Sequence, residues 1–290
     1  NDEQQQIIET VRRYARERVR PAAHDADESG ATPPEIISTG WELGLLPSAL
    51  PEQYGGFGDE HSAVTGALAA EELGYGDLAA ALHLLTPNLF GIPLLHCGTE
   101  EQKKKWLPQL TDAEFVPATA ALVEPRWDFS PHTLNTTAER AQNNYVLNGH
   151  KAFVPLAAEA QAMLVYAREG GATQAFIVEK GTSGVTILDR EKNMGLRALP
   201  TYEVKFEDVR VPREARLGGD AGCQIDLLLN YSRVALASLA VGVARGVAIG
   251  IVCLAQFRRE GGGVELRPLQ FRLGRRLGGF SSLGDNSREN

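Results

Sequence analysis

The chain has 290 residues, of which 43% are hydrophobic and 23% are charged, and its formal net charge is -8. This length is enough for two domains, and the composition is that of a globular protein, which excludes a disordered chain or a disulfide scaffold. The negative charge argues against a nucleic-acid partner, because phosphate binding needs clustered Lys and Arg. Cys97, Cys223 and Cys253 are far apart and lack CxxC spacing, so we expect a reducing, cytoplasmic setting.

Helices are expected in the first part of the chain, because apolar residues recur there every three or four positions. Thr99 and Gln102 predict a capping box, in which the Thr side chain and the Gln side chain each satisfy a free backbone N–H. Gly44 is a plausible C-cap. The expected helices span residues 4–19, 34–43, 62–73 and 78–85, together with a segment that opens at residue 99.

After Leu110 the pattern changes to short β-prone runs separated by turn residues. Strands are expected at 115–123, 145–154, 163–167, 175–179, 185–188 and 202–209, and helical character returns over 224–257. The spacing favours an antiparallel sandwich or barrel. The fold class is therefore α+β, with an N-terminal helical domain (1–112), a middle β-domain (113–220) and a truncated or atypical C-terminal helical region (221–290).

The segment 234–255 is almost entirely apolar and raises the question of a membrane span. Arg245 lies near its centre, which would cost roughly 2.5–3.5 kcal/mol in a bilayer on insertion scales. The spacing by four of Gly242, Gly246 and Gly250 suits close packing of a buried helix equally well. We therefore expect no membrane span.

The sequence lacks the motifs of several common enzyme classes. No dinucleotide-binding, P-loop, zincin or nucleophile-elbow motif occurs. The six histidines have no ligand spacing, so no metal site is expected. Glu71 and Glu72 are adjacent on a helix and point in different directions, which predicts a solvated helix edge and not an acid/base pair.

The segment from Gly98 to Pro108 reads GTEEQKKKWLP and is similar to the signature G-T-E-x-Q-K-x-x-[YW]-L-P of acyl-CoA dehydrogenases. Further segments resemble the same family in the same order, at residues 43–46, 54–58, 71–74, 147–151, 206–212 and 217–218. The resemblance covers about residues 3 to 257. It implies a helical domain, a β-domain and a second helical bundle that enclose FAD and an acyl chain.

The resemblance also implies an activity in fatty acid metabolism. In this family a glutamate removes the α-proton of an acyl-CoA thioester while hydride passes from the β-carbon to flavin N5. The implied cofactor is FAD, the implied substrate is an acyl-CoA, and the implied partners are an electron acceptor such as an electron-transfer flavoprotein and further copies of the chain.

Residues 123–130 and 151–156 stand for the family's flavin-holding segments T-E-P-x-A-G-S-D and W-I-T-N. Val123 replaces the Thr of the first segment, and Phe153 and Pro155 replace the aromatic residue and the Thr of the second. Each lost hydrogen bond to the flavin would weaken binding by about 0.5–1.5 kcal/mol. The resemblance implies FAD contacts from Leu122, Val123, Phe153, Val154 and Pro155.

Two substrate contacts are implied, Phe129 near the Ser of the first motif and Arg233 on the first helix of the second bundle. Family members that place the base on this helix have it immediately before the Arg, where this chain has Ser232. The more usual base lies later, and too few residues follow Phe257 to build that part of the bundle. The catalytic base is therefore not identified.

Three hypotheses remain open from the sequence. The chain is an incomplete or impaired acyl-CoA dehydrogenase, a degenerate relative that binds flavin or acyl-CoA without dehydrogenating it, or a subunit that shares its active site with a partner chain. The first is favoured by the change to an Arg- and Gly-rich composition after Gln256.

Overall fold

The computed structural model describes residues 2–58 and 62–259. The chain divides into one unit that spans Asn1–Ala248 and a second that starts at Ile249, of which the end of helix α8 is described. The helices of the first 111 residues are α1 (Asp2–Tyr14), α2 (Arg20–Ser29), α3 (Pro34–Trp41), α4 (Ala63–Gly76), α5 (Leu78–Leu85), α6 (Asn88–Cys97) and α7 (Glu100–Trp106). A π-helical turn (Ala15–Val19) joins α1 to α2, and short 3-10 turns lie at Pro47–Ala49, Glu52–Tyr54 and Leu107–Thr111.

The expected helices are present, and two helices, α2 and α6, were missed. Helix α6 contains Pro93, and a proline within a helical pattern normally predicts a break. The capping box at the start of α7 is confirmed, since Gln102 N–H donates to Thr99 Oγ1 and Gln102 Oε1 accepts from Thr99 N–H. The C-cap prediction for Gly44 was wrong, because α3 ends at Trp41 and its C-cap is Glu42; Gly44 lies in the turn that follows, with a φ of +65°.

The strands are β1 (Ala118–Ala121), β2 (Thr137–Ala141), β3 (Asn144–Pro155), β4 (Ala162–Glu169), β5 (Ala172–Glu179), β6 (Val185–Arg190) and β7 (Thr201–Pro212). They form one sheet in the order β1-β4-β2-β3-β7-β6, with β5 paired to β4. The α+β fold class is confirmed, but the sheet is mixed where a purely antiparallel one was expected, because β1 pairs with β4 in parallel. Strand β2 was missed, since its sequence TAERA is largely polar.

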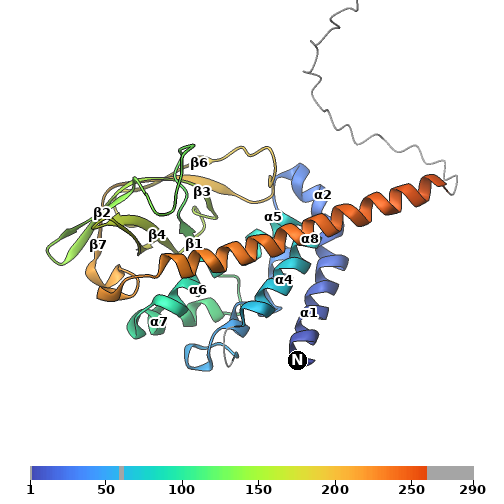
Figure 1. Cartoon of the computed structure of the whole chain (residues 1–290), viewed down its shortest axis with the longest axis horizontal. Coiled ribbons are helices and arrows are strands. Elements are labelled where there is room, and N and C mark those ends of the chain that lie inside the picture. Colours follow the sequence, from blue (N-terminus) through green and yellow to red (C-terminus); the bar gives the residue numbers. More distant parts are fainter. Residues whose placement is uncertain (1, 59–61, 260–290) are drawn as a thin grey trace, which may run out of the picture. The chain divides into compact units, whose positions relative to one another are not determined.

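Helices and sheet share a core within the first unit. One cluster joins Trp41, Phe90 and Trp106 of the helices to Tyr166 of β4 and Leu228 of α8 (Ile225–Arg259). A second cluster fills the interior of the sheet itself. Figure 1 shows the strands gathered beside α6 and α7, with α8 passing from the sheet to α4. The shared core fixes the end of β1 and the start of α8 against the same helices. The part of the expected C-terminal region after residue 259 lies outside the described residues.

The prediction that Glu71 and Glu72 form a solvated helix edge was wrong for Glu72, which is only 3% exposed. Arg245 of α8 donates to Glu72 Oε2 at 2.6 Å and to Glu71 Oε1 at 2.6 Å, and Arg12 of α1 reaches Glu72 Oε1 at 3.0 Å. The Arg245 guanidinium also lies 5.1 Å from the centre of the Tyr75 ring. The two carboxylates therefore anchor α8 to the N-terminal helices.

Among the described helices, α8 is long and apolar enough to span a membrane by itself, over Ile225–Ile251. Helices α5 and α6, bent by 41° at their break, pass the same test only as a pair. The ion pairs of Arg245 favour packing of α8 against protein, because moving Arg245 into lipid would break its pairs with Glu71 and the buried Glu72. The absence of a membrane span stays a prediction.

The contact between α8 and α4 leaves no room for a side chain at Gly242. A Cβ added there would lie 2.0 Å from the Glu71 carbonyl oxygen. We expect Gly242→Ala to lower the free energy of unfolding by about 1–3 kcal/mol, although alanine favours helix by about 1 kcal/mol. Urea unfolding measures this change. Gly66→Ala on α4 is the matched control, because nothing lies within 4 Å of its Cβ position. Equal stabilities of the two variants would contradict the close contact.

Candidate active site

Two segments predicted to contact FAD lie side by side at one end of the sheet. The Ala152 N–H of β3 donates to the Val123 carbonyl, which follows β1, at 2.9 Å. The Lys151 Nζ donates to the Leu122 carbonyl at 3.0 Å. The structure thus brings Leu122 and Val123 next to Lys151 and Ala152, which lie 29 positions later in the sequence.

A buried ion pair holds these segments together. Lys151 is 0% exposed and Glu124 is 3% exposed, and Lys151 Nζ lies 3.1 Å from Glu124 Oε1. Glu124 also accepts the N–H groups of Asn135 and Thr136, each at 2.8 Å, and Arg126 Nε at 3.2 Å. The carboxylate is therefore the centre around which the loop from β1 to β2 is folded.

The pKa values of the pair follow from this geometry. Burial by itself would raise the pKa of Glu124, but the hydrogen bonds from Asn135 and Thr136 and the charge of Lys151 outweigh it and lower the pKa to about 2. Burial lowers the pKa of Lys151 to about 8, against the opposing effect of Glu124. At neutral pH the pair is ionised, and each partner depends on the other for its charge.

Phe153 has a strained backbone and an exposed ring. Its φ is +54°, a region in which non-glycine residues are uncommon, and its side chain is 56% exposed. The pairing of β3 with β7 is irregular between Lys151 and Val154, and this irregularity turns Phe153 outward while Val154 remains buried. The Phe153 N–H donates to Glu191 Oε1 at 3.3 Å. Observed strain of this kind is concentrated at functional sites.

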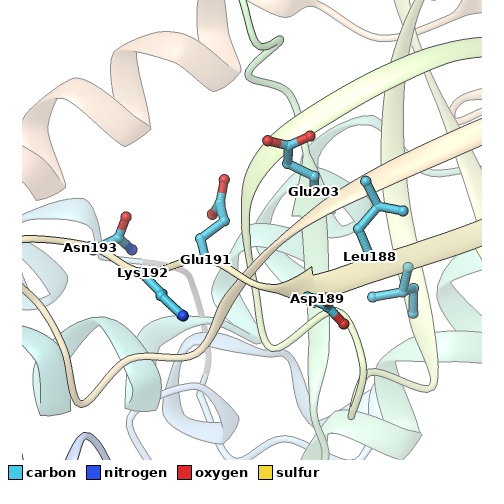
Figure 2. Close-up of a pocket in the computed structure, with 7 residues that line it drawn as sticks. Leu188, Asp189, Glu191, Lys192, Asn193 and Glu203 are labelled. Carbon is cyan, nitrogen blue, oxygen red and sulfur yellow. The ribbon is translucent and has the colours of Figure 1, made fainter.

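An open cavity of about 660 Å³ is lined in part by Glu191, the residue whose carboxylate accepts the Phe153 N–H. It is lined by Ile187, Leu188, Asp189, Glu191, Lys192, Asn193 and Glu203. Figure 2 shows the side chains of Glu191 and Glu203 directed toward the top of the view, with the Lys192 amine pointing the opposite way. The Glu191 Oε2 atom is buried without a hydrogen-bond partner. The rim near Phe153 is thus acidic.

The two predicted substrate contacts lie on separate elements. Phe129 is half-buried and packs against the core cluster that also contains Leu228 of α8. Arg233 is exposed on α8, where its guanidinium donates to Asn230 Oδ1 at 3.2 Å. Ser232 Oγ donates to the Leu228 carbonyl at 3.1 Å. The structure brings the Phe129 loop to the start of α8, but no contact joins Phe129 to Arg233 within the described part of the chain.

Pro155 and Leu156 complete the second predicted segment. Pro155 is half-buried at the end of β3 opposite Thr201, and Leu156 is buried with a φ of +53°. Pro155 offers no N–H to a ligand. Its predicted FAD contact can therefore involve only its ring and its carbonyl oxygen.

The sequence patterns did not predict the Glu124–Lys151 ion pair or the contact of Glu191 with Phe153. One signal was available, since Tyr145, Leu147 and Lys151 have the same parity in β3 and alternation predicts that all three point inward. No group of three His, Cys, Asp or Glu residues suited to a metal ion lies within residues 2–58 and 62–259. Cys97 and Cys223 are free thiols.

Comparison with known proteins decides the family. The models of the acyl-CoA dehydrogenase N-terminal domain and middle domain match residues 1–114 and 119–209. The short-chain specific acyl-CoA dehydrogenase of Sus scrofa is 31% identical over 93% of this chain and 67% of its own length. The chain belongs to the acyl-CoA dehydrogenase family.

Other relatives agree with this family. A probable medium-chain specific acyl-CoA dehydrogenase of Caenorhabditis briggsae is 36% identical over 84% of this chain. The crystal structure of a glutaryl-CoA dehydrogenase of Mycobacterium smegmatis in complex with FADH2 superposes with a TM-score of 0.74 at 28% identity over 85% of the chain. The chain spans 62% of the first of these two proteins and 63% of the second.

Proposed function

We propose that this protein binds FAD and an acyl-CoA thioester, and that it forms part of an enzyme that dehydrogenates the acyl group between its α- and β-carbons. The observation that carries the proposal is Phe153, whose ring is exposed on a strained backbone at the position of the family's flavin-contacting aromatic residue. Relatives named as acyl-CoA dehydrogenases support the substrate class, and the relative in complex with FADH2 supports the cofactor.

The residues present fit the flavin ring better than its polar edge. The exposed ring of Phe153 offers a face for stacking. Val123 and Phe129 have no hydroxyl, and Pro155 has no N–H, so three polar contacts of the motifs are missing. FAD, when bound, supplies the acceptor for hydride. Stacking on Phe153 and contacts with backbone groups would hold it, with weaker affinity than the intact motifs give.

The residues of this chain have distinct tasks in this proposal. The Glu124–Lys151 pair orients the two flavin-facing segments, and Val154 anchors β3 in the core. Phe129 contributes an apolar wall for the acyl group, and Arg233 attracts the polar end of the thioester ligand. Ser232 cannot act as a carboxylate base, and its hydroxyl is already donated to the Leu228 carbonyl. Residue 232 therefore supplies no base for the α-proton.

A second candidate is a subunit that shares its site with a partner chain. The observation that favours it is the apolar surface of α8, where Val234, Leu236, Val241 and Val247 are all about half exposed and lie on opposite sides of the helix. An apolar surface that runs round a helix in this way is normally covered. Homo-oligomer formation is the simplest way to cover it, and the molar mass of the purified protein by light scattering tests this. A monomer at micromolar concentration would contradict a shared site between copies.

We also propose that the protein works as a soluble cytoplasmic enzyme that passes electrons to an electron-transfer flavoprotein. The ion pairs of Arg245 with Glu71 and Glu72 support the soluble state, because they hold α8 against the N-terminal helices. Reduction of an electron-transfer flavoprotein by the substrate-reduced protein tests the acceptor.

An absorption spectrum of the purified chain, scanned before and after anaerobic addition of acyl-CoAs, tests the main proposal. We expect flavin bands after reconstitution with FAD and little bleaching by any acyl-CoA. Phe153→Ala is expected to weaken FAD binding about tenfold, because one stacking face is lost. The matched control is Phe57→Ala, which removes another exposed aromatic ring. A chain that binds no FAD would overturn the proposal, whereas rapid bleaching would overturn only the impairment.

A further inference from the structure

Trp127 is the most exposed aromatic residue near the candidate site. Its side chain is 98% exposed, whereas Trp41 and Trp106 are buried. A tryptophan side chain presents a large apolar surface, and a fully hydrated one forgoes the stabilisation that burial would give. An exposed tryptophan indicates a ligand contact when the backbone around it is firmly held.

Polar contacts of the neighbouring residues hold the loop that carries Trp127. The Arg126 guanidinium contacts Glu124 Oε2 at 3.2 Å, reaches Asp128 Oδ1 at 3.4 Å and donates to the Thr133 carbonyl. His132 Nε2 lies 3.6 Å from Asp226 Oδ1 at the start of α8. These contacts hold the backbone on both sides of Trp127. The ring is therefore displayed on an ordered loop, which lowers the entropy lost when a ligand binds to it.

The surroundings of Trp127 do not resemble a protein-docking surface. Over the described residues 116–149, no other large apolar side chain is exposed. The adjacent side chains are those of Arg126 and Asp128, both charged. Protein interfaces are built on a contiguous apolar patch with a polar rim, and Trp127 among charged neighbours, with Phe153 as the other exposed ring of the site, offers no such patch. A small planar ligand suits these surroundings better.

The hydrogen bond between Ala152 N–H and the Val123 carbonyl limits the distance between Trp127 and Phe153. Trp127 follows Val123 by four residues, which span at most about 14 Å, and Phe153 follows Ala152 by one residue, about 3.8 Å. With about 5 Å between the paired backbones, the two Cα atoms lie at most about 23 Å apart. The motif that this segment resembles has alanine at the position of Trp127, so this ring is a feature of the present chain.

We propose that Trp127 is a second stacking surface, which binds the planar heteroaromatic ring of a nucleotide ligand beside Phe153. The ring is either the isoalloxazine or the adenine of the ligands in the proposed function, on which this inference rests. Aromatic side chains bind such rings through stacking without needing a particular hydrogen-bond pattern. Trp127 would offset part of the polar contacts that Val123, Phe129 and Pro155 lack.

Tryptophan fluorescence of the full chain gives a direct readout of this contact. Trp127 is accessible to acrylamide in the free protein, while Trp41 and Trp106 are shielded. We expect FAD or a coenzyme A thioester to protect Trp127 from quenching. Riboflavin and FMN carry only the isoalloxazine, ADP carries only the adenine, and FAD carries both, so these four probes identify the ring that stacks.

Substitutions of Trp127 test whether its contact contributes to ligand affinity. Trp127→Ala is expected to weaken binding of the protecting ligand about tenfold, and Trp127→Phe to keep it within about threefold, since a smaller ring still stacks. Phe57→Ala is the control, as it removes an exposed aromatic ring of the N-terminal region and should leave affinity unchanged. Thermal unfolding of the unliganded Trp127→Ala chain should match that of the parent, because so exposed a side chain contributes little packing.

The possible outcomes separate the two proposals. Unchanged FAD and acyl-CoA affinity in Trp127→Ala would overturn this inference and leave the proposed function intact. Protection by a coenzyme A thioester or ADP in a chain that binds no FAD would support the stacking role and contradict the proposed cofactor. Protection that appears only as the protein concentration rises would mean that Trp127 contacts another chain, and it would overturn the inference, as would the lack of protection by any probe.

Discussion

Ser232→Glu is expected to raise the rate at which acyl-CoA bleaches the bound flavin by about 100-fold or more. A positioned general base contributes about 10²–10⁴-fold to a rate. Ser232 precedes Arg233 on α8 at the position where some family members carry their base, and its side chain is exposed enough to be replaced by a longer one. Stopped-flow absorbance after anaerobic mixing of the FAD-loaded chain with acyl-CoA measures this rate.

Ser232→Gln is the matched control, because glutamine has the size of glutamate and cannot accept a proton. It should bleach as slowly as the parent. The rate of the Glu variant should rise with pH through the pKa of the new carboxyl group, and that of the Gln variant should not. If the Glu variant binds FAD and acyl-CoA as the parent does and yet bleaches no faster, residue 232 is not the position from which this chain can supply a base.

Glu124→Leu is expected to lower the free energy of unfolding by about 3–5 kcal/mol. Removing one partner of a buried ion pair leaves the other charge uncompensated, and that cost exceeds the value of the pair itself. In this variant the Lys151 ammonium would keep the Leu122 carbonyl as its hydrogen-bond partner, and the N–H groups of Asn135 and Thr136 would lose theirs. Urea unfolding of the parent and variant measures the difference.

A control variant and a double variant test whether the unpaired charge causes this loss of stability. Glu179→Leu removes one partner of the exposed pair with Lys105, which spans 2.7 Å, and should change stability by less than about 1 kcal/mol. The double variant Glu124→Leu, Lys151→Met should recover part of the loss, because no unpaired charge remains. A loss in Glu124→Leu no greater than that in Glu179→Leu would contradict the role given to the buried pair.

The same pair predicts a dependence of stability on pH. The pKa of Glu124 is about 2 in the folded chain and 4.5 for the unperturbed group, so its contribution is present above pH 4.5 and is lost as the pH falls toward 2. For Lys151 the folded pKa of about 8 lies below 10.5, so the unfolded chain binds more protons between these values and stability rises with pH there. Both slopes should be smaller in the double variant.

The sequence determined the parts of this protein that depend on neighbours along the chain. Apolar periodicity predicts α4, α5 and α8, because a helix repeats every 3.6 residues whatever it packs against. The capping box of Thr99 and Gln102 joins positions three residues apart and was equally accessible. The ordered motifs predicted the family, and with it the α+β fold.

The tertiary structure decided whatever depends on contacts between distant residues. Strand β2 exists because β3 pairs with it, despite its polar sequence. Glu72 is buried because Arg245, 173 positions away, reaches it, and Lys151 is buried because Glu124 and the Leu122 carbonyl compensate its charge. Exposure of Trp127 and Phe153 likewise follows from a clamped loop and an irregular strand pairing. Local patterns report what a residue prefers, while the cost of burying a charge or exposing a ring is set by the groups that the fold brings around it.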